Sequence, residues 1–464
     1  MSLLVEKVIN NLSERNLLPE FPEGFNFPLP AINKVELYLS FYGNDRCAHC
    51  ITNSGPDRKE ILSPDDTRRV IENVANYSII TRLGSIFGGG SFRFGRPDRC
   101  RELDELQEPP DGMTEESIQE YVDCLAGRGY TSEWVKGDVA VKLNFGRPSV
   151  RISGGEFYTW PHVVDGKKVP EDERLNYQKK LLDDIRALLP EYDIFILTNG
   201  RFAEDDDKAK CVMSHWAGGE ASDGGRTRIC VSVDIFHSPP KGSTLEQMLE
   251  RIWVTSRGAG LGAPFLYGVT NHQVALVGRA METFGNCDRC NPEFENVSGS
   301  CFNPAKNIIL DPVDLTVMNG CRELKGFVCE TEKGTLFVNN IIVLPSGRLA
   351  YCCVCVGDLG DFLNNPEECM RNYMKDPVAV MLRQKQTAAN LLNTAAQMDP
   401  TIKLFKEGEN AAVTGSTCYQ LLSGRRISEP SFRRGTQEAR RRTKDFRRKT
   451  KDLRRKLKRS RHRT

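Results

Sequence analysis

The chain has 464 residues, of which 39% are hydrophobic and 16 are cysteines, and its formal net charge is +2. This length allows one large domain plus a smaller one, and no run approaches the roughly 20 apolar residues that cross a bilayer. The early acid Glu6 is atypical of an export signal. We therefore expect a cytoplasmic protein without a membrane anchor, in which many cysteines indicate metal or cluster binding rather than disulfides.

The first predicted elements lead to a pair of thiols. Residues 1–32 form a short amphipathic helix and a Pro/Phe-rich connector, and the alternating run Val35–Phe41 predicts a strand. This strand runs into Cys47 and Cys50. Ser63 followed by Pro64 is typical of a helix start, and this helix is expected to reach about Tyr77.

The next stretch, residues 84–146, is too long and irregular for a simple strand–helix repeat, so it is interpreted as an insertion. It contains Cys100 and a predicted helix near residues 115–127. A short apolar strand at 150–152 follows and ends at Gly154-Gly155-Glu156. Two glycines bring bare backbone close to a small ligand, and the acid can hold an amine.

Strands and helices then alternate. A helix at 176–189 precedes the strand 193–197, which ends at Thr198-Asn199-Gly200. After another helical stretch, the strand 228–234 ends at Ser232-Val233-Asp234. A helix at 244–251 and strands at 266–269 and 273–277 complete the series. This order predicts a parallel α/β barrel or partial barrel, whose chemistry lies at the carboxyl ends of its strands.

These strand ends, taken together, resemble the radical S-adenosylmethionine (radical SAM) superfamily over roughly residues 33–375. The resemblance implies a partial (β/α)6 TIM-like barrel over 33–283. It also implies that Cys47 and Cys50 ligate a [4Fe-4S] cluster and that His49 packs near the adenine. The remaining residues implied to bind S-adenosylmethionine or line its site are Gly154, Gly155, Glu156, Asn199, Ser232 and Asp234.

The family pattern has three cysteines, and the position of the first is Gly43 in this chain. Three explanations stay open. Cys100 completes the cluster, or the protein has lost the cluster and kept the fold, or the thiols hold zinc. Phe157 also stands where the family has proline after Gly-Gly-Glu.

A cysteine-rich segment, residues 284–375, follows the predicted barrel. Residues 343–352 look like a β-hairpin leading into a ligand cysteine, which is similar to the SPASM and twitch extensions that hold auxiliary iron–sulfur clusters. One auxiliary cluster is expected, with zinc as the rival metal because thiolates suit both. The candidate ligands are Cys287, Cys290, Cys301, Cys321, Cys329, Cys352, Cys355 and Cys369.

The chain ends in a predicted helical region, 376–432, and a basic tail, 433–464. The tail carries 17 Lys and Arg against three acids, a net charge of +14 that leaves −12 for the other residues. It contains the near repeat Thr443–Lys449 and Thr450–Lys456. Such a segment is expected to be a disordered, solvated arm, or to dock electrostatically on nucleic acid or an acidic partner.

The resemblance implies an enzyme that cleaves S-adenosylmethionine reductively to a 5′-deoxyadenosyl radical and acts on a peptide or protein. Two alternatives remain. One is a radical SAM-fold protein without catalysis that serves as a binding or scaffold protein, as Gly43 suggests. The other is a zinc-binding, nucleic-acid-associated protein anchored by its tail.

Overall fold

The structure is a computed structural model. It describes residues 3–18, 29–44, 54–87, 90–95, 131–136, 139–143, 147–218, 226–232, 240–262, 264–270, 295–300, 302–303, 308–309, 327–331, 334–350, 358–383 and 385–399. Among these residues, no helix is both long enough and apolar enough to cross a membrane.

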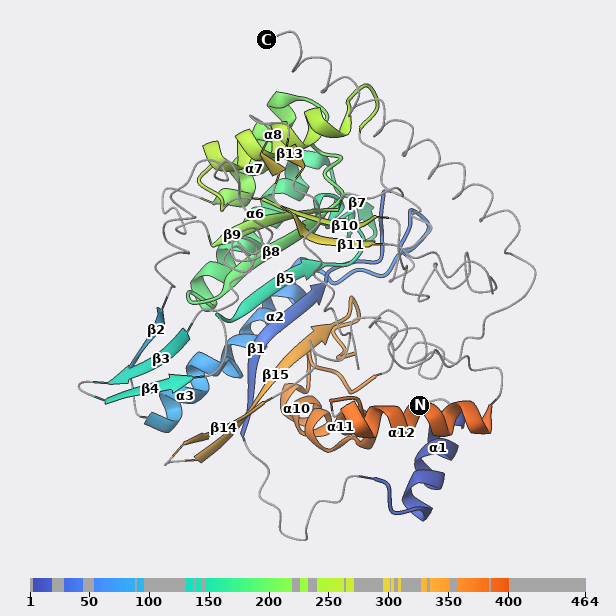
Figure 1. Ribbon diagram of the computed structural model, residues 1–464. Coiled ribbons are helices and arrows are strands. Elements are labelled where there is room, and N and C mark those ends of the chain that lie inside the picture. Colours follow the sequence, from blue (N-terminus) through green and yellow to red (C-terminus); the bar gives the residue numbers. More distant parts are fainter. Residues whose placement is uncertain are drawn as a thin grey trace.

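An eight-stranded sheet forms the centre of the protein, in the order β11-β10-β9-β8-β5-β1-β15-β14 (Figure 1). Neighbours from β10 through to β15 run parallel, and the outer pairs β10–β11 and β14–β15 are antiparallel. The strands are β1 (Leu29–Tyr38), β5 (Ser149–Ser153), β8 (Asp193–Thr198), β9 (Thr227–Ser232), β10 (Phe265–Thr270), β11 (Glu295–Ser300), β14 (Phe327–Thr331) and β15 (Gly334–Val343). The fold is thus mixed α/β with a parallel sheet, and its closure into a barrel stays a prediction.

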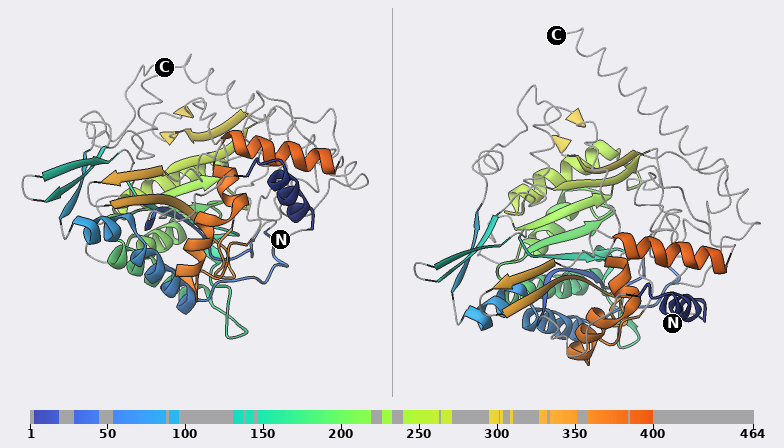
Figure 2. Two further views of the ribbon diagram at one scale, coloured as in Figure 1. Left: turned by 90° about the horizontal axis from the view of Figure 1, so that it is seen from below. Right: turned by 60° about the horizontal axis from the view of Figure 1, so that its bottom comes forward.

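Helices α2, α6, α7 and α8 pack side by side as one layer against this sheet (Figure 2). Their buried positions follow a helical period, as with Leu181, Leu182 and Ile185 on α6. Each such side chain stabilises the fold by about 1.5–3 kcal/mol. The helices in this layer are α2 (Pro64–Asn76), α6 (Glu171–Leu188), α7 (Asp206–Ala217) and α8 (Leu245–Gly258).

The predicted start of α2 is confirmed. Ser63 is its N-cap, with its side chain accepting a hydrogen bond from the Asp66 amide, and Pro64 occupies the first turn. The helix ends at Asn76 with Tyr77 as C-cap. The strands predicted at 150–152, 193–197, 228–234 and 266–269 appear as β5, β8, β9 and β10 with slightly different ends, whereas 273–277 lies outside the described residues.

Strand β15 lies beside β1 and runs parallel to it, with Leu37 opposite Val343. This part of the predicted cysteine-rich segment is therefore hydrogen-bonded into the central sheet. The predicted hairpin turn after it is confirmed, because the Leu344 amide donates to the Arg348 carbonyl at 2.9 Å and Val343 bridges Leu349.

The two ends of the described chain meet away from the helix layer. Helix α1 packs against α12 (Figures 1 and 2). The helices here are α1 (Leu3–Glu14), α10 (Pro366–Lys375), α11 (Pro377–Arg383) and α12 (Lys385–Met398).

The insertion predicted at 84–146 is described only in part. It contributes the end of α3 (Ile79–Phe87) and a separate antiparallel sheet in the order β2-β3-β4. The helix expected near 115–127 lies outside the described residues. The sheet strands are β2 (Ser91–Gly95), β3 (Thr131–Lys136) and β4 (Val139–Leu143).

Candidate functional site

The two glycines after β5 allow two backbone segments to pass unusually close. Gly154 has φ +121°, and a Cβ on it would overlap the Ser40 carbonyl oxygen. A Cβ on Gly155 would overlap the Tyr42 carbonyl, and the Gly155 amide donates to Ser40 O at 2.6 Å. The space that glycine opens is therefore filled by the segment after β1, which leads to Cys47.

That segment is held at both of its described ends. The Gly43 amide donates to Gly55 O at 3.3 Å, and the Gly55 amide donates to Phe41 O at 3.0 Å. Ser40 adds a hydroxyl that accepts from the Tyr42 amide at 2.8 Å. The stretch containing Cys47 and Cys50 thus begins and ends beside the tip of β5, although the two thiols and His49 lie outside the described residues.

Glu156 links the tips of β5 and β8. Its side chain is buried, with 4% exposed, and one carboxylate oxygen accepts from Thr198 Oγ1 at 2.7 Å and from the Tyr158 amide at 3.2 Å. The other accepts from the Asn199 amide at 2.8 Å. A buried carboxylate requires such donors, because an isolated charge is costly to remove from water.

Asn199 extends this network to a third strand. Its Nδ2 donates to Asn44 Oδ1 at 2.7 Å, and its Oδ1 accepts from the Arg201 amide at 3.1 Å. Asn44 follows β1, Glu156 follows β5 and Asn199 follows β8. The predicted residues Glu156 and Asn199 are therefore brought together at the carboxyl edge of three neighbouring parallel strands.

Ser232 ends β9 at the same edge, since Val231 is opposite Thr198 in the register of β8 and β9. The next residue predicted for the site, Asp234, lies outside the described residues. Cys230 on the same strand has its pKa raised to about 11 by burial. A thiol in such surroundings stays protonated at neutral pH.

Sequence reasoning missed Asn44 and a stacked pair, Tyr42 and His162. Their rings are 4.1 Å apart and inclined by 17°. Burial, and then the Arg174 guanidinium, lower the pKa of His162. The sequence did offer a signal for Asn44, because it lies between the predicted strand Val35–Phe41 and the two thiols. It offered none for His162, which is nine residues beyond β5 and reaches Tyr42 only in the folded protein.

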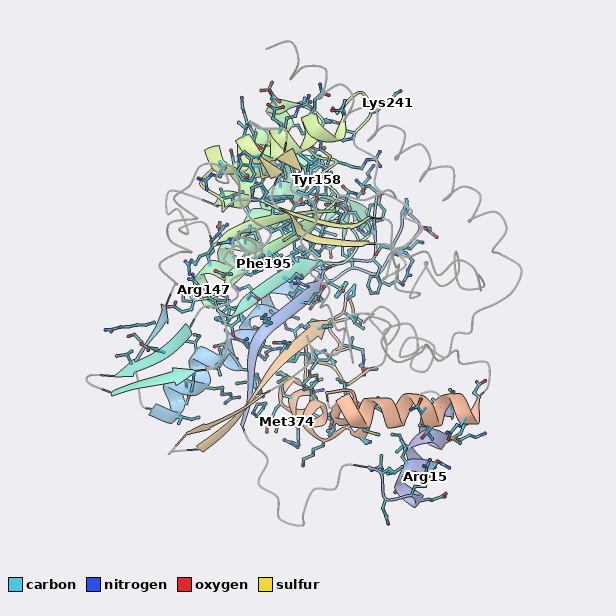
Figure 3. The ribbon with its side chains drawn as sticks, viewed as in Figure 1. Arg15, Arg147, Tyr158, Phe195, Lys241 and Met374 are labelled. Atoms are coloured by element: carbon cyan, nitrogen blue, oxygen red, sulfur yellow. The ribbon has the colours of Figure 1, made fainter. Side chains whose placement is uncertain are left out.

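Gln178 on α6 holds the loop after β5 in place. The Nε2 of this fully buried side chain lies 2.6–3.0 Å from the carbonyl oxygens of Phe157, Tyr158 and Trp160, which share its two N–H groups. Its Oε1 accepts from Trp216 Nε1 at 2.8 Å. Gln178 therefore positions the backbone that carries Glu156. Figure 3 shows Tyr158 in the half of the molecule that holds α6–α8, away from Met374 near α10.

The predicted metal ligands are only partly described. Cys369 is 1% exposed in α10, and burial, followed by the Asp361 carboxylate, raises the pKa of its thiol to about 12. Within the described ranges, no three His, Cys, Asp or Glu side chains gather as a metal site. Cys329 lies on β14, where only its backbone is described; the others, Cys47, Cys50, Cys100, Cys287, Cys290, Cys301, Cys321, Cys352 and Cys355, lie outside the described residues.

No family model and no curated protein matches this sequence. Two crystal structures of SuiB from Streptococcus suis align with it. The one bound to precursor peptide SuiA has 11% identity and a TM-score of 0.28, covering 82% of this chain and 70% of that chain. The one bound to S-adenosylmethionine has 11% identity and a TM-score of 0.22, covering 82% and 71%. TM-scores this low do not establish a common fold.

Proposed function

We propose that the protein is radical SAM-like and binds S-adenosylmethionine at the tips of β1, β5 and β8. The observation that supports this is the buried Glu156 carboxylate, held by Thr198 and Asn199 beside the segment that leads to the thiol pair. An ionised carboxylate is an acceptor-only group, which is the chemistry that an ammonium group requires. With the cluster bound, the cofactor would supply a 5′-deoxyadenosyl radical for hydrogen abstraction from a peptide or protein.

The chain's own residues have distinct parts in this proposal. Cys47 and Cys50 would hold the cluster, with Cys100 as the third ligand. Glu156 would hold the amino group of the ligand, and the hydrogen bond between Asn199 and Asn44 would keep the ends of β8 and β1 at a fixed spacing. The auxiliary metal, iron–sulfur or zinc, would belong to the cysteines between residues 287 and 355, whereas Cys369 has a buried thiol in the hydrophobic cluster and would take no part.

The test is anaerobic reconstitution with iron and sulfide, followed by addition of S-adenosylmethionine and a reductant. We expect the visible absorbance of an iron–sulfur cluster and 5′-deoxyadenosine as a product. Cys50→Ala should abolish both, whereas Cys211→Ala, at an exposed thiol on α7, should change neither. Glu156→Gln should keep the iron and weaken binding of labelled S-adenosylmethionine in equilibrium dialysis.

A second candidate is a non-catalytic binding or scaffold protein with this fold. It is favoured by Gly43, which occupies the position of the first family cysteine and whose amide is used in pairing with Gly55. Colourless protein with stoichiometric zinc and no 5′-deoxyadenosine would overturn the enzyme. Unchanged iron content in Cys100→Ala would remove that residue as the third ligand.

A further inference from the structure

The small sheet β2-β3-β4 projects from the central domain. It lies beyond the amino ends of the parallel strands, away from Glu156 at their carboxyl ends (Figures 1 and 2). Its strands make their closest contacts with one another, and in the described part of the chain no helix crosses either of its faces. Within the described residues, this sheet is therefore available to a further partner.

The register of the sheet gives it two unlike faces. Directly opposite residues of an antiparallel pair lie on the same face, and Phe92, Trp134 and Val141 form one such row. Phe94 and Leu143 lie two positions away on the same face, opposite Ser132 between them. We call the face with these five hydrophobic residues the apolar face. The other face carries a row of charged residues, namely Arg93, Glu133 and Lys142.

The apolar face requires a cover. A charged face of an antiparallel sheet can remain in water, whereas contiguous apolar area of this kind is normally buried against another element or a partner. A three-stranded sheet also depends on burying such a face for its own stability. The alternation of residues along β2, β3 and β4 therefore indicates that a further apolar surface packs on this side of the sheet.

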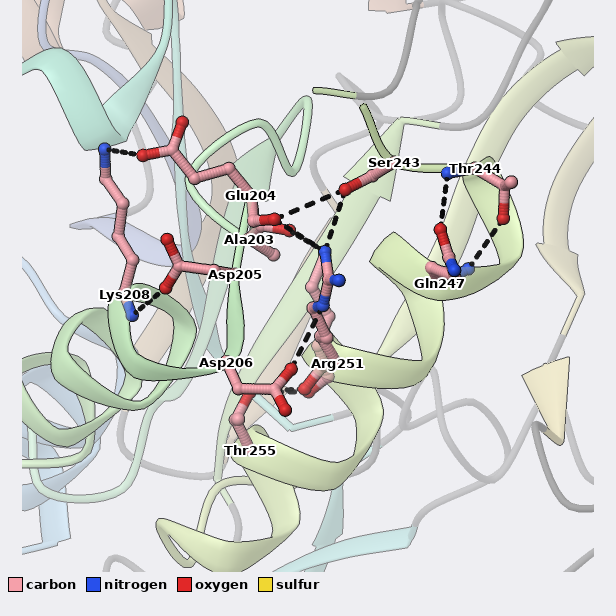
Figure 4. A network of polar contacts seen from close by, with 11 residues as sticks. Ala203, Glu204, Asp205, Asp206, Lys208, Ser243, Thr244, Gln247, Arg251 and Thr255 are labelled. Atoms are coloured by element: carbon pink, nitrogen blue, oxygen red, sulfur yellow. Dashed lines mark hydrogen bonds and ion pairs between the residues drawn. The ribbon is translucent and has the colours of Figure 1, made fainter. Parts of the chain in front are cut away.

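The helices of the central layer are already engaged with one another. Arg251 on α8 forms an ion pair with Asp206 on α7 at 3.0 Å and donates to the Glu204 carbonyl oxygen at 2.7 Å (Figure 4). The buried residues of α7, among them Val212 and Met213, belong to the main hydrophobic core. These helices are fixed in the central layer, so the cover for the apolar face comes from elsewhere.

The segment between β2 and β3 has a matching surface in its sequence. Residues 96–130 lie outside the described residues, and they include the helix predicted near 115–127. Ile118, Tyr121, Val122 and Leu125 recur at helical spacing and would form one apolar stripe. The other side of this helix would carry polar residues, namely Glu116, Gln119, Glu120 and Asp123.

We propose that the predicted helix 115–127 docks on the apolar face of the β2-β3-β4 sheet through this stripe. Only residues 128–130 separate the helix from Thr131, the first residue of β3, and connections of about 2–6 residues are usual between a helix and a neighbouring strand. A helix of this length spans about 20 Å, and β3 also spans about 20 Å. The helix can therefore run back along the strand that follows it.

The connectivity favours this segment over a separate molecule. Gly95 and Thr131 are opposite each other at one end of the sheet, so both ends of the segment leave from the same place. A short tether also gives the segment a high effective concentration at the sheet. The insertion would then be a small module in which a helix covers one face of a sheet. The contact does not require the proposed function, because it lies at the opposite edge of the central sheet from Glu156.

Hydrogen exchange of the full-length protein, measured by mass spectrometry in peptides covering 91–95 and 131–143, reports the stability of the small sheet. Ile118→Asp places a charge in the stripe, and Gln119→Asp places the same charge one residue away on the polar side. We expect Ile118→Asp to speed exchange in both peptides by at least about tenfold and Gln119→Asp to leave it unchanged. Peptides from β5 and β8 should exchange at the wild-type rate in both variants.

Ile118→Ala and Gln119→Ala form a milder pair with the same expected order. They decide the test if Ile118→Asp also speeds exchange in β5 and β8. Equal exchange of the small sheet in the members of this pair would overturn the proposal, as would an absence of protection at residues 115–127 in the wild type. Protection of the sheet that falls on dilution of the wild type would also overturn it, because it would assign the apolar face to a second copy.

Discussion

Glu156 and Cys369 are both buried, yet their surroundings differ in kind. The Glu156 carboxylate accepts three hydrogen bonds from the tips of β5 and β8. Cys369 lies in a hydrophobic cluster with Phe362, Met370 and Tyr373, and a Cβ added to Gly360 would overlap its sulfur. The surroundings of Glu156 therefore depend on hydrogen-bond donors at fixed positions, and those of Cys369 depend on how well its side chain fills the available volume.

This difference separates the effects expected of small changes in the two regions. At the strand tips, replacing a single atom leaves a buried donor or acceptor without a partner, which costs about 1–3 kcal/mol. Around Cys369, a change of similar size removes only van der Waals contact and apolar burial. The strand-tip region should consequently be the more sensitive of the two to substitutions that preserve shape.

The largest effect is expected for Gly155→Ala. The new Cβ would overlap the Tyr42 carbonyl, which is backbone and cannot rotate away, so one of the two segments must move. We expect a loss of unfolding free energy of at least about 3 kcal/mol in urea titrations. Gly258→Ala is the matched control, because nothing lies within 4 Å of its Cβ position at the end of α8. It should stabilise the protein by about 0.5–1 kcal/mol, and equal losses in both variants would contradict the crowding at Gly155.

Gln178→Leu should have the next largest effect. Leucine has a similar size but removes the Gln178 partner of the Tyr158 and Trp160 carbonyls and of the Trp216 indole N–H, whereas the Phe157 carbonyl still accepts from the Trp160 amide. We expect a loss of about 3 kcal/mol, less than the sum of separate bonds because the loop can relax. Lys180→Ala on the exposed side of α6 should change stability by less than about 0.5 kcal/mol. A Gln178→Leu variant as stable as this control would show that the loop is held by other contacts.

Sequence patterns predicted β5, β8, β9, β10 and the start of α2 because their signals are local. Apolar runs identify β5 and β8, and Ser63-Pro64 marks the start of α2. The pairing of Glu156 with Asn199 was foreseeable only in outline, since parallel strands end at a common edge. The acid was expected to hold a ligand, and its bonds to Thr198 and Asn199 were not anticipated.

What the sequence could not reveal depends on distant contacts. The place of β15 beside β1 joins residues about 300 apart, and no local pattern encodes such a partner. The stacking of Tyr42 on His162 likewise needs the turn of the loop after β5. The role of Gln178 as a donor could not be predicted, because a single polar residue in a helix is expected to face solvent until its spatial neighbours are known.

Glu156→Gln should cost about 2 kcal/mol, because the amide group can accept at only one of the two positions where Thr198 and Asn199 donate. Cys369→Ala provides the comparison in the apolar region and should cost about 1 kcal/mol through lost contact. A double-mutant cycle of Glu156→Gln with Thr198→Val should be clearly non-additive, while Glu156→Gln with Cys369→Ala should be additive. Additivity in the first pair would mean that the hydrogen bond between Glu156 and Thr198 contributes nothing.

The smallest predicted effect is a pH dependence from His162. Burial, and then Arg174, lower the pKa of His162 in the folded protein, whereas the unfolded chain keeps a value near about 6.5. The unfolded state therefore binds more protons below about pH 6.5, so the contribution of His162 to stability is complete above that pH and declines as the pH falls toward the lowered value.

His162→Phe keeps an aromatic ring against Tyr42 without a titrating group. Its stability should vary less between pH 7 and about pH 5 than that of the wild type in urea titrations. A His162→Phe slope identical to wild type would mean that the stack tolerates a charged imidazole.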